Sequence, residues 1–411
     1  MSVQDITRRK DSRTERAPLT LLRTPRTESL AERARRTAEV AALHAEAVDR
    51  EARFPAEAIA AAKANGLMGA MAPRSLGGEG ASLSEVADVC YTLARACAST
   101  AMIYAMHQVK VACVVRHGVG ARWHEAFLRR LARDQLLIAS STTEGQKGGD
   151  VRSSEAPIER AGERIGLERA ASVISYGAEA DAIVTTARRA ADAAASDQVL
   201  AVFLSDDYTL ERTGGWDTLG MRGTRSAGFS LRAHGEAAQI LPVPYEAIHV
   251  QSMTPTAHIL WSSVWAGVAA EAVEKARKHL RKSLRATGGE PPVSMPHFNK
   301  ASAALRKLRA LVAASLRRYE ALRDDAGALS ALDFQSEIAL LKVDASELAV
   351  EAVMAAMRCG GLTAYRNDTE ASLGRSLRDI LSAPIMIAND RILANLGASA
   401  LLTEAPASVR G

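Results

Sequence analysis

Residues 136–143, LLIASSTT, mark the point at which the sequence changes from helical to stranded character. Before them, apolar residues recur every three or four positions and Ala, Leu and Arg dominate, as in amphipathic helices. After them come short runs rich in Val, Ile, Ser and Thr, separated by polar or glycine turns, which predict strands. Helical spacing returns from about residue 257. We therefore expect an α+β fold with a β-domain between two helical domains.

The expected organisation has four segments. We predict a disordered basic leader (1–27), an N-terminal helical domain (28–135), a middle antiparallel β-barrel domain (136–250) and a C-terminal helical bundle (251–411). The predicted strands beyond the first are SVISYG (172–177), DAIVTTAR (181–188), VLAVFLS (199–205), FSLRAH (229–234) and QILPVPY (239–245). A β-domain held between helical lobes creates a cleft at the junction, which is a favoured place for a cofactor.

Composition narrows the class of protein. A chain of 411 residues buries an ample core, and its net charge of +5 is modest. Seven of the first 27 residues are Lys or Arg, without the interleaved aromatic residues of a nucleic-acid-binding arm. No apolar run approaches the ~20 residues that span a bilayer, and no signal peptide is evident, so we expect a cytoplasmic protein. The four cysteines and nine histidines show no metal-ligand spacing, so no metal site is expected.

Several segments combine glycines with hydroxyl residues. They are NGLMGAMAPRSLGGEGASLSE (65–85), TTEGQKGGDVRSS (142–154), ASVISYGAEADAIVTTAR (171–188), GWDTLGMRGTRS (215–226) and MRCGGLTAYRNDTEASLGRSLRD (357–379). Hydroxyls and free backbone N–H groups near glycines bind the polar edge of a ring system and the phosphates of a ligand. Glycine also lets the backbone approach a ligand closely.

Taken together, these segments resemble the acyl-CoA dehydrogenase flavoproteins over roughly residues 28–403. Residues 142–154 are similar to the family's Thr-Glu-Pro-x-x-Gly-Ser-Asp segment, and residues 171–188 to its Lys-x-Trp-Ile-Thr-Asn-Gly strand, with Val173 in place of the tryptophan. The resemblance implies the family fold, a homo-oligomer (tetramer or dimer) and a bound flavin, expected as FAD between the β-domain and the C-terminal bundle.

The resemblance also implies flavin-binding residues. Carried over by position, they are Thr142, Thr143, Gly148, Gly149, Ile174, Ser175, Gly360, Gly361, Asn389 and Arg391. Ser175 matches the hydroxyl residue expected near the flavin N5 atom. Gly360 and Gly361 match a turn that approaches the pyrophosphate or the ribityl chain.

One expected residue is missing from GRSLRDILSAPIMIANDRILANL (374–396). In the family, a catalytic glutamate follows an Arg-Asp pair. Here the pair is present, but Ile387 occupies the glutamate position. The candidates for a displaced base are Asp390, three residues further on, and His258, near the start of the helix that opens the C-terminal domain.

Three functions remain open. The leading interpretation is α,β-dehydrogenation of an acyl-CoA or acyl-carrier thioester by an atypical base, with an electron-transfer flavoprotein as acceptor. The second is a flavin monooxygenase that takes FMN or loosely bound reduced flavin from a partner reductase, because oxygen chemistry needs no α-proton base. The third is a non-catalytic flavin- or acyl-binding protein.

Overall fold

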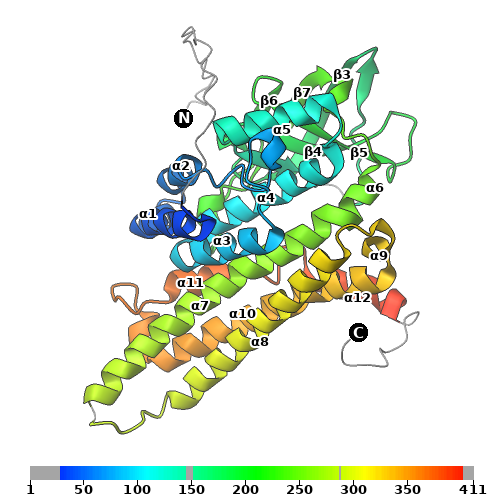
Figure 1. Cartoon of the computed structure of the whole chain (residues 1–411). Helices are drawn as coiled ribbons and strands as arrows, with labels where there is room; N and C mark the ends of the chain where they lie inside the picture. Colours follow the sequence, from blue (N-terminus) through cyan, green and yellow to red (C-terminus); the bar gives the residue numbers. More distant parts are fainter. Residues whose placement is uncertain (1–27, 145–150, 287, 401–411) are drawn as a thin grey trace.

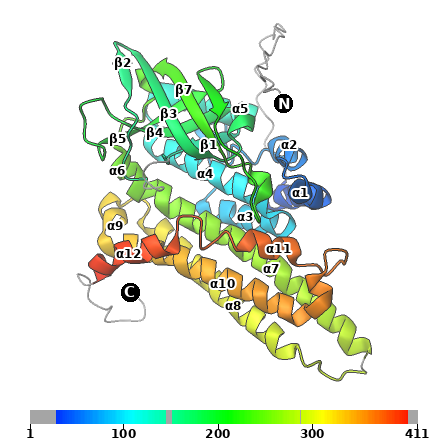
Figure 2. The same cartoon turned by 180° about the vertical axis from the view of Figure 1, so that it is seen from behind.

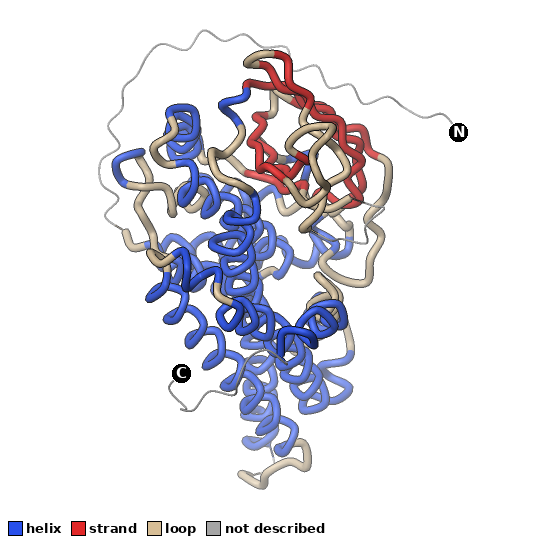
Figure 3. The backbone as a smooth tube through the Cα atoms, turned by 90° about the vertical axis from the view of Figure 1, so that its right-hand side faces the viewer, coloured by secondary structure: helices blue, strands red, loops and turns tan. Residues whose placement is uncertain are grey.

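The computed structural model describes residues 28–144, 151–286 and 288–400. The predicted leader lies outside these residues. The strands gather at one end of the molecule, and long helices run away from them (Figures 1 and 3). This layout confirms the predicted fold class, with an N-terminal helical part, a middle β part and a C-terminal helical part.

The N-terminal part contains α1 (Leu30–Arg50), α2 (Ala56–Ala64), α3 (Leu83–Ala96), α4 (Ala98–Gly118) and α5 (Arg122–Asp134). Capping boxes fix the starts of α1 and α3, with Ser29 and Ser82 each satisfying a free N–H group of the first turn. The continuous helical pattern between Ser82 and His117 breaks at Cys97, which adopts an extended conformation (φ −149°, ψ 113°). This break turns α4 along the β-domain, with nearly all of its residues buried.

The β part forms two sheets. Its strands are β1 (Ile138–Ser141), β2 (Glu159–Ala161), β3 (Arg164–Ile174), β4 (Ala182–Arg188), β5 (Gln198–Leu204), β6 (Tyr208–Arg212) and β7 (Ala227–Glu236). The strand orders are β1-β4-β5 and β2-β3-β7-β6. All pairs are antiparallel, as expected, except β1 with β4, which is parallel because the chain crosses through the second sheet between them.

The predicted strand 239–245 is wrong. Only Ile240 makes a bridge, to Ala201, and the chain then enters α6 (Tyr245–Ile248). Pro242 and Pro244 explain the failure, since proline has no N–H group to donate to a sheet.

The C-terminal part is built around α7 (Thr254–Ala286), which follows a π-helical turn at His249–Met253. The remaining helices are α8 (Met295–Leu322), α9 (Ala326–Ser330), α10 (Leu332–Tyr365), α11 (Gly374–Ile380) and α12 (Asn389–Ala400). The helix α7 packs against α3 and α4 on one side and against α8 and α10 on the other (Figure 2). Although α7 has 33 residues, neither it nor any other described helix is long and apolar enough to cross a membrane.

A buried junction ties the β part to α11 and α1. The Met221 N–H group donates to Asp379 Oδ1 at 2.7 Å, and burial raises the pKa of Asp379 to about 6. Arg378 forms an ion pair with Asp49 of α1, with Nη1 and Oδ1 3.0 Å apart. Gly220 lies directly on this junction, where a Cβ atom would stand 2.1 Å from the Arg378 carbonyl oxygen.

We predict that Gly220→Ala destabilises the protein by about 1–3 kcal/mol, because the added methyl group forces the β part and α11 apart. Urea denaturation of the full chain measures the free energy of unfolding. Gly215→Ala, five residues earlier, is the matched control because its Cβ atom meets no other atom within 4 Å. Equal stability of the two variants would show that the junction does not depend on this close contact.

Candidate functional site

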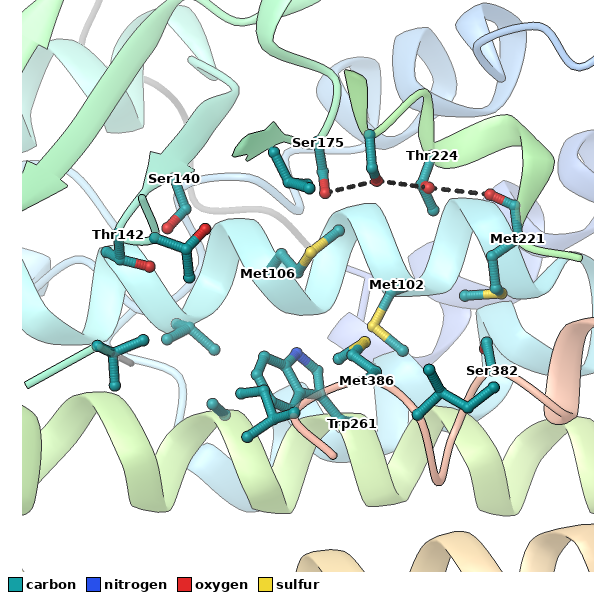
Figure 4. A pocket seen from close by; sticks show the side chains of 18 of the residues that line it. Met102, Met106, Ser140, Thr142, Ser175, Met221, Thr224, Trp261, Ser382 and Met386 are labelled. Atoms are coloured by element: carbon teal, nitrogen blue, oxygen red, sulfur yellow. Dashed lines mark hydrogen bonds between the residues drawn. The ribbon is translucent and has the colours of Figure 1, made fainter. Parts of the chain in front are cut away.

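A cavity of about 580 Å³ lies where the β part meets α4, α7 and the segment after α11. Its size is within the range of about 300–1,000 Å³ that small-molecule and cofactor sites occupy. Figure 4 shows α4 and α7 on opposite sides of the cavity, with the segment that carries Ser382 and Met386 beside them. Of the described residues that the resemblance implicates, Thr142, Thr143 and Ser175 line this cavity, as does Ile387 at the expected glutamate position.

Most of the cavity wall is apolar and polarisable. Met102 and Met106 project from successive turns of α4, and Met253, Trp261 and Met386 also belong to this lining. Methionine side chains are flexible and make favourable contacts with aromatic rings. The wall therefore suits a planar apolar ligand better than a strongly hydrated one.

Hydroxyl groups form a relay on the β side of the cavity (Figure 4). Ser175 Oγ lies 2.7 Å from Ser226 Oγ, which lies 2.8 Å from Thr224 Oγ1. Thr224 Oγ1 donates to the Met221 carbonyl oxygen at 2.9 Å. Because a carbonyl only accepts, all three hydroxyl hydrogens point toward Met221 when every bond of the relay is made. Ser175 Oγ then offers its lone pairs to a donor in the cavity.

The predicted flavin-binding residues at the ends of β1 and β3 lie along the same cavity. Thr142 and Thr143 follow β1 and line the cavity, as do Val173 and Ser175. Side chains alternate across a strand, so Ile174 points the other way and is fully buried in the core. Gly148 and Gly149 lie outside the described residues.

The segment after α11 places the expected glutamate position in the cavity wall. Ile387 lines the cavity with a left-handed backbone (φ 51°), a conformation that is strained for a β-branched residue. Its neighbours Ile385 and Met386 also line the cavity, so this part of the wall is apolar. Asp390 and Arg391 are exposed on α12 and do not line the cavity.

Asn389 lies outside the cavity lining and connects α12 to α10. Its Oδ1 atom accepts from Lys342 Nζ at 2.6 Å, and its Nδ2 atom donates to Ser346 Oγ and Glu347 Oε1 at 3.0 and 2.9 Å. These contacts fix the start of α12. Gly360 and Gly361 also lie away from the cavity, near the end of α10, where Gly361 has a positive φ of 55°.

The ionisable groups among the described residues of the cavity wall are all basic. No Asp or Glu occurs among the described residues of its wall, which includes Lys110, His249, His258 and Arg378. In the part of the chain that the structure describes, no group of three or more His, Cys, Asp or Glu is placed to hold a metal ion.

His258 is held as a neutral ring. Its Nδ1 atom lies 2.7 Å from the Ile338 carbonyl oxygen, and burial lowers the pKa of His258 to about 4. Because the carbonyl only accepts, Nδ1 carries the hydrogen of the neutral imidazole and Nε2 keeps a lone pair. His258 can therefore accept a hydrogen bond or a proton from a ligand.

Sequence reasoning missed three polar residues of the site. Thr224 and Ser226 lie in the quoted turn 215–226, but only the folded chain brings them against Ser175. Lys110 is the one charged residue of AMHQVKVACVV (105–115) in α4 when histidine is neutral, and this lone lysine was the signal available.

Comparison with known proteins identifies the family. The family model described as acyl-CoA dehydrogenase, N-terminal domain, matches residues 24–135, and the acyl-CoA dehydrogenase C-terminal domain model matches residues 253–402. A search of curated proteins gives no match.

Solved structures with the same fold include oxygenases. FMN-bound TdsC from Paenibacillus sp. A11-2, a dibenzothiophene monooxygenase, has a TM-score of 0.79 and 18% identity over 92% of this chain and 98% of its own. The methanesulfinate monooxygenase MsuC from Pseudomonas fluorescens has a TM-score of 0.78 and 21% identity over the same shares. A nitrososynthase from Micromonospora carbonacea var. africana has a TM-score of 0.76 and 22% identity over 90% and 95%. The two domain models together cover more than half of the sequence, so this chain belongs to the acyl-CoA dehydrogenase family.

Proposed function

We propose that this protein is a flavin-dependent monooxygenase that receives reduced flavin from a separate reductase and oxygenates an apolar substrate. The bound flavin supplies two electrons to O₂, so that one oxygen atom enters the substrate and the other leaves as water. TdsC and MsuC, which share the fold, are named as monooxygenases, and this supports the choice. The dehydrogenase interpretation that led the sequence analysis becomes the second candidate.

The observation that carries the proposal is the absence of a carboxylate from the described wall of the cavity. An acyl thioester dehydrogenase needs a base within about 3 Å of the substrate α-proton. Ile387 occupies the family's position for that base, and Asp390 is exposed outside the cavity lining. An oxygenation needs no such base, and an apolar wall protects the reacting centre from water.

The residues present fit a flavin ring. Ser175 and the Thr142–Thr143 pair offer hydroxyls from the β side, while the methionines of α4 and Trp261 of α7 offer apolar surface. We propose FMN in place of the FAD expected at first, because structures of TdsC and KijD3 with the same fold hold FMN. A homo-oligomer, dimer or tetramer, and a cytoplasmic location stay predictions.

The direction of the hydroxyl relay favours reduced flavin. If Ser175 faces the flavin N5 atom, it accepts the N5 hydrogen of the reduced ring while all three relay bonds remain. An oxidised N5 only accepts, so Ser175 must donate to it and Ser226 must donate to Ser175. The relay then loses one bond, either the one between Ser226 and Thr224 or the one from Thr224 to Met221. The difference is one hydrogen bond, about 1 kcal/mol or about fivefold in affinity.

His258 supports the second candidate, dehydrogenation of an acyl thioester. Its neutral ring lines the cavity and has a lone pair on Nε2, so it is able to take a proton from a substrate. A pKa of about 4 makes it a weak base at neutral pH, which lowers the efficiency of proton abstraction.

We predict that the purified protein, supplied with FMN, a flavin reductase and NADH, oxygenates an aromatic probe such as indole. Mass spectrometry should show one atom of ¹⁸O from ¹⁸O₂ in the product. Under anaerobic conditions, a panel of acyl-CoA thioesters should leave the 450 nm absorbance of bound flavin unchanged, because the described wall of the cavity holds no carboxylate to remove the α-proton. Bleaching by acyl-CoA that is lost in His258→Ala would overturn the proposal in favour of the dehydrogenase.

We predict that Ser226→Ala lowers the preference for reduced flavin about fivefold, because the Ser175 hydroxyl is then free to donate or to accept. Anaerobic titration with oxidised and with dithionite-reduced FMN measures the ratio of the two dissociation constants. Ser140→Ala is the matched control, since Ser140 lines the same cavity but takes no part in the relay. If the ratio of dissociation constants changed equally in Ser226→Ala and Ser140→Ala, the direction of the relay would not determine the preference for reduced flavin.

A further inference from the structure

Lys110 is a buried cation in the cavity wall. It lies on the same face of α4 as Met102 and Met106, and it is two turns, or about 12 Å, from Met102. The side chain is 5% exposed. Its Nζ atom lies 3.4 Å from Met253 Sδ, and a thioether is only a weak acceptor.

The charge of Lys110 has no counter-charge among the described residues. It makes no ion pair there, and the described wall of the cavity contains no carboxylate. Arg378, the other permanent cation of the wall, is paired with Asp49. Burial lowers the pKa of Lys110 to about 8, so roughly nine-tenths of the molecules carry the charge at pH 7.

A buried charge without a partner is costly, and an anion brought by a ligand removes that cost. We propose that Lys110 binds a carboxylate of the substrate, which makes the substrate an apolar, ring-sized molecule with one acidic group. This inference rests on the proposed function, because it assumes that the substrate binds in this cavity. Lys110 is then a specificity-determining residue that orients the apolar body along α4.

The surroundings of Lys110 favour a substrate carboxylate over a flavin phosphate. Phosphate sites combine several cations with free backbone N–H groups. Lys110 lies in the interior of α4, where the backbone N–H groups are already used, and its neighbours in the wall include Met106, Val109 and Met253. Because Arg378 is already paired with Asp49, the one unpaired lysine in the described, largely apolar wall matches a single negative charge.

The test compares 2-naphthoate with its uncharged isostere 2-naphthamide, using quenching of tryptophan fluorescence without flavin. Trp216 and Trp261 line the cavity and report binding. We expect the wild-type protein to bind the carboxylate about tenfold more tightly than the amide. Lys110→Met, which matches the neighbouring methionines in shape, should reduce the preference to less than about twofold, and Lys110→Arg should retain it.

Lys342→Met is the matched control, because Lys342 is another fully buried lysine but lies outside the cavity lining and is held by Asn389. It should keep the preference for the carboxylate. A preference that persists in Lys110→Met would overturn the inference. The inference would also be overturned if Lys110→Met weakened the binding of FMN but not that of riboflavin, because Lys110 would then bind the flavin phosphate. The binding test involves no turnover. Its outcome therefore does not depend on whether the monooxygenase reaction is observed.

Discussion

The packing of α7 against α4 on one side and α10 on the other is the constraint on which the candidate site depends. Residues of α7 such as Leu260, Val264 and Trp265 are almost completely buried, so the helix cannot shift without opening the core. The cavity lies between α4 and α7 and the end of the β part. Its apolar wall is thus part of the main core. A ligand that enters the cavity therefore loses contact with water.

Three polar features of the cavity have a defined electrostatic state. The Ser175 relay has a preferred direction because it ends on a carbonyl oxygen. His258 is neutral because it is buried and donates to α10. Lys110 is charged and lacks a carboxylate partner among the described residues. The site thus has a hydrogen-bond acceptor, Ser175, on the β side and a cation, Lys110, on the α4 side. This asymmetry orients an amphipathic ligand in the cavity.

Helical and stranded patterns predicted the order of the three parts, because periodicities of 3.6 and 2 residues reflect burial of one face. The resemblance to the family, and not these patterns, pointed to Thr142, Thr143, Ser175 and Ile387, which all line the cavity. The patterns failed where a local feature changed the geometry, as at the prolines of 239–245 and at the break at Cys97. Asn389 lies where family contacts were expected, yet its hydrogen bonds tie α12 to α10.

The sequence by itself determined the family, the α+β order and the replacement of the expected glutamate by Ile387, since each of these is a property of residue order and spacing. The tertiary structure decided which polar groups act together. Ser226 and Thr224 reach Ser175 only because β7 pairs with β3. Lys110 faces a cavity whose described wall has no carboxylate only because α4 packs against α7, and no spacing along the chain encodes that meeting of distant segments.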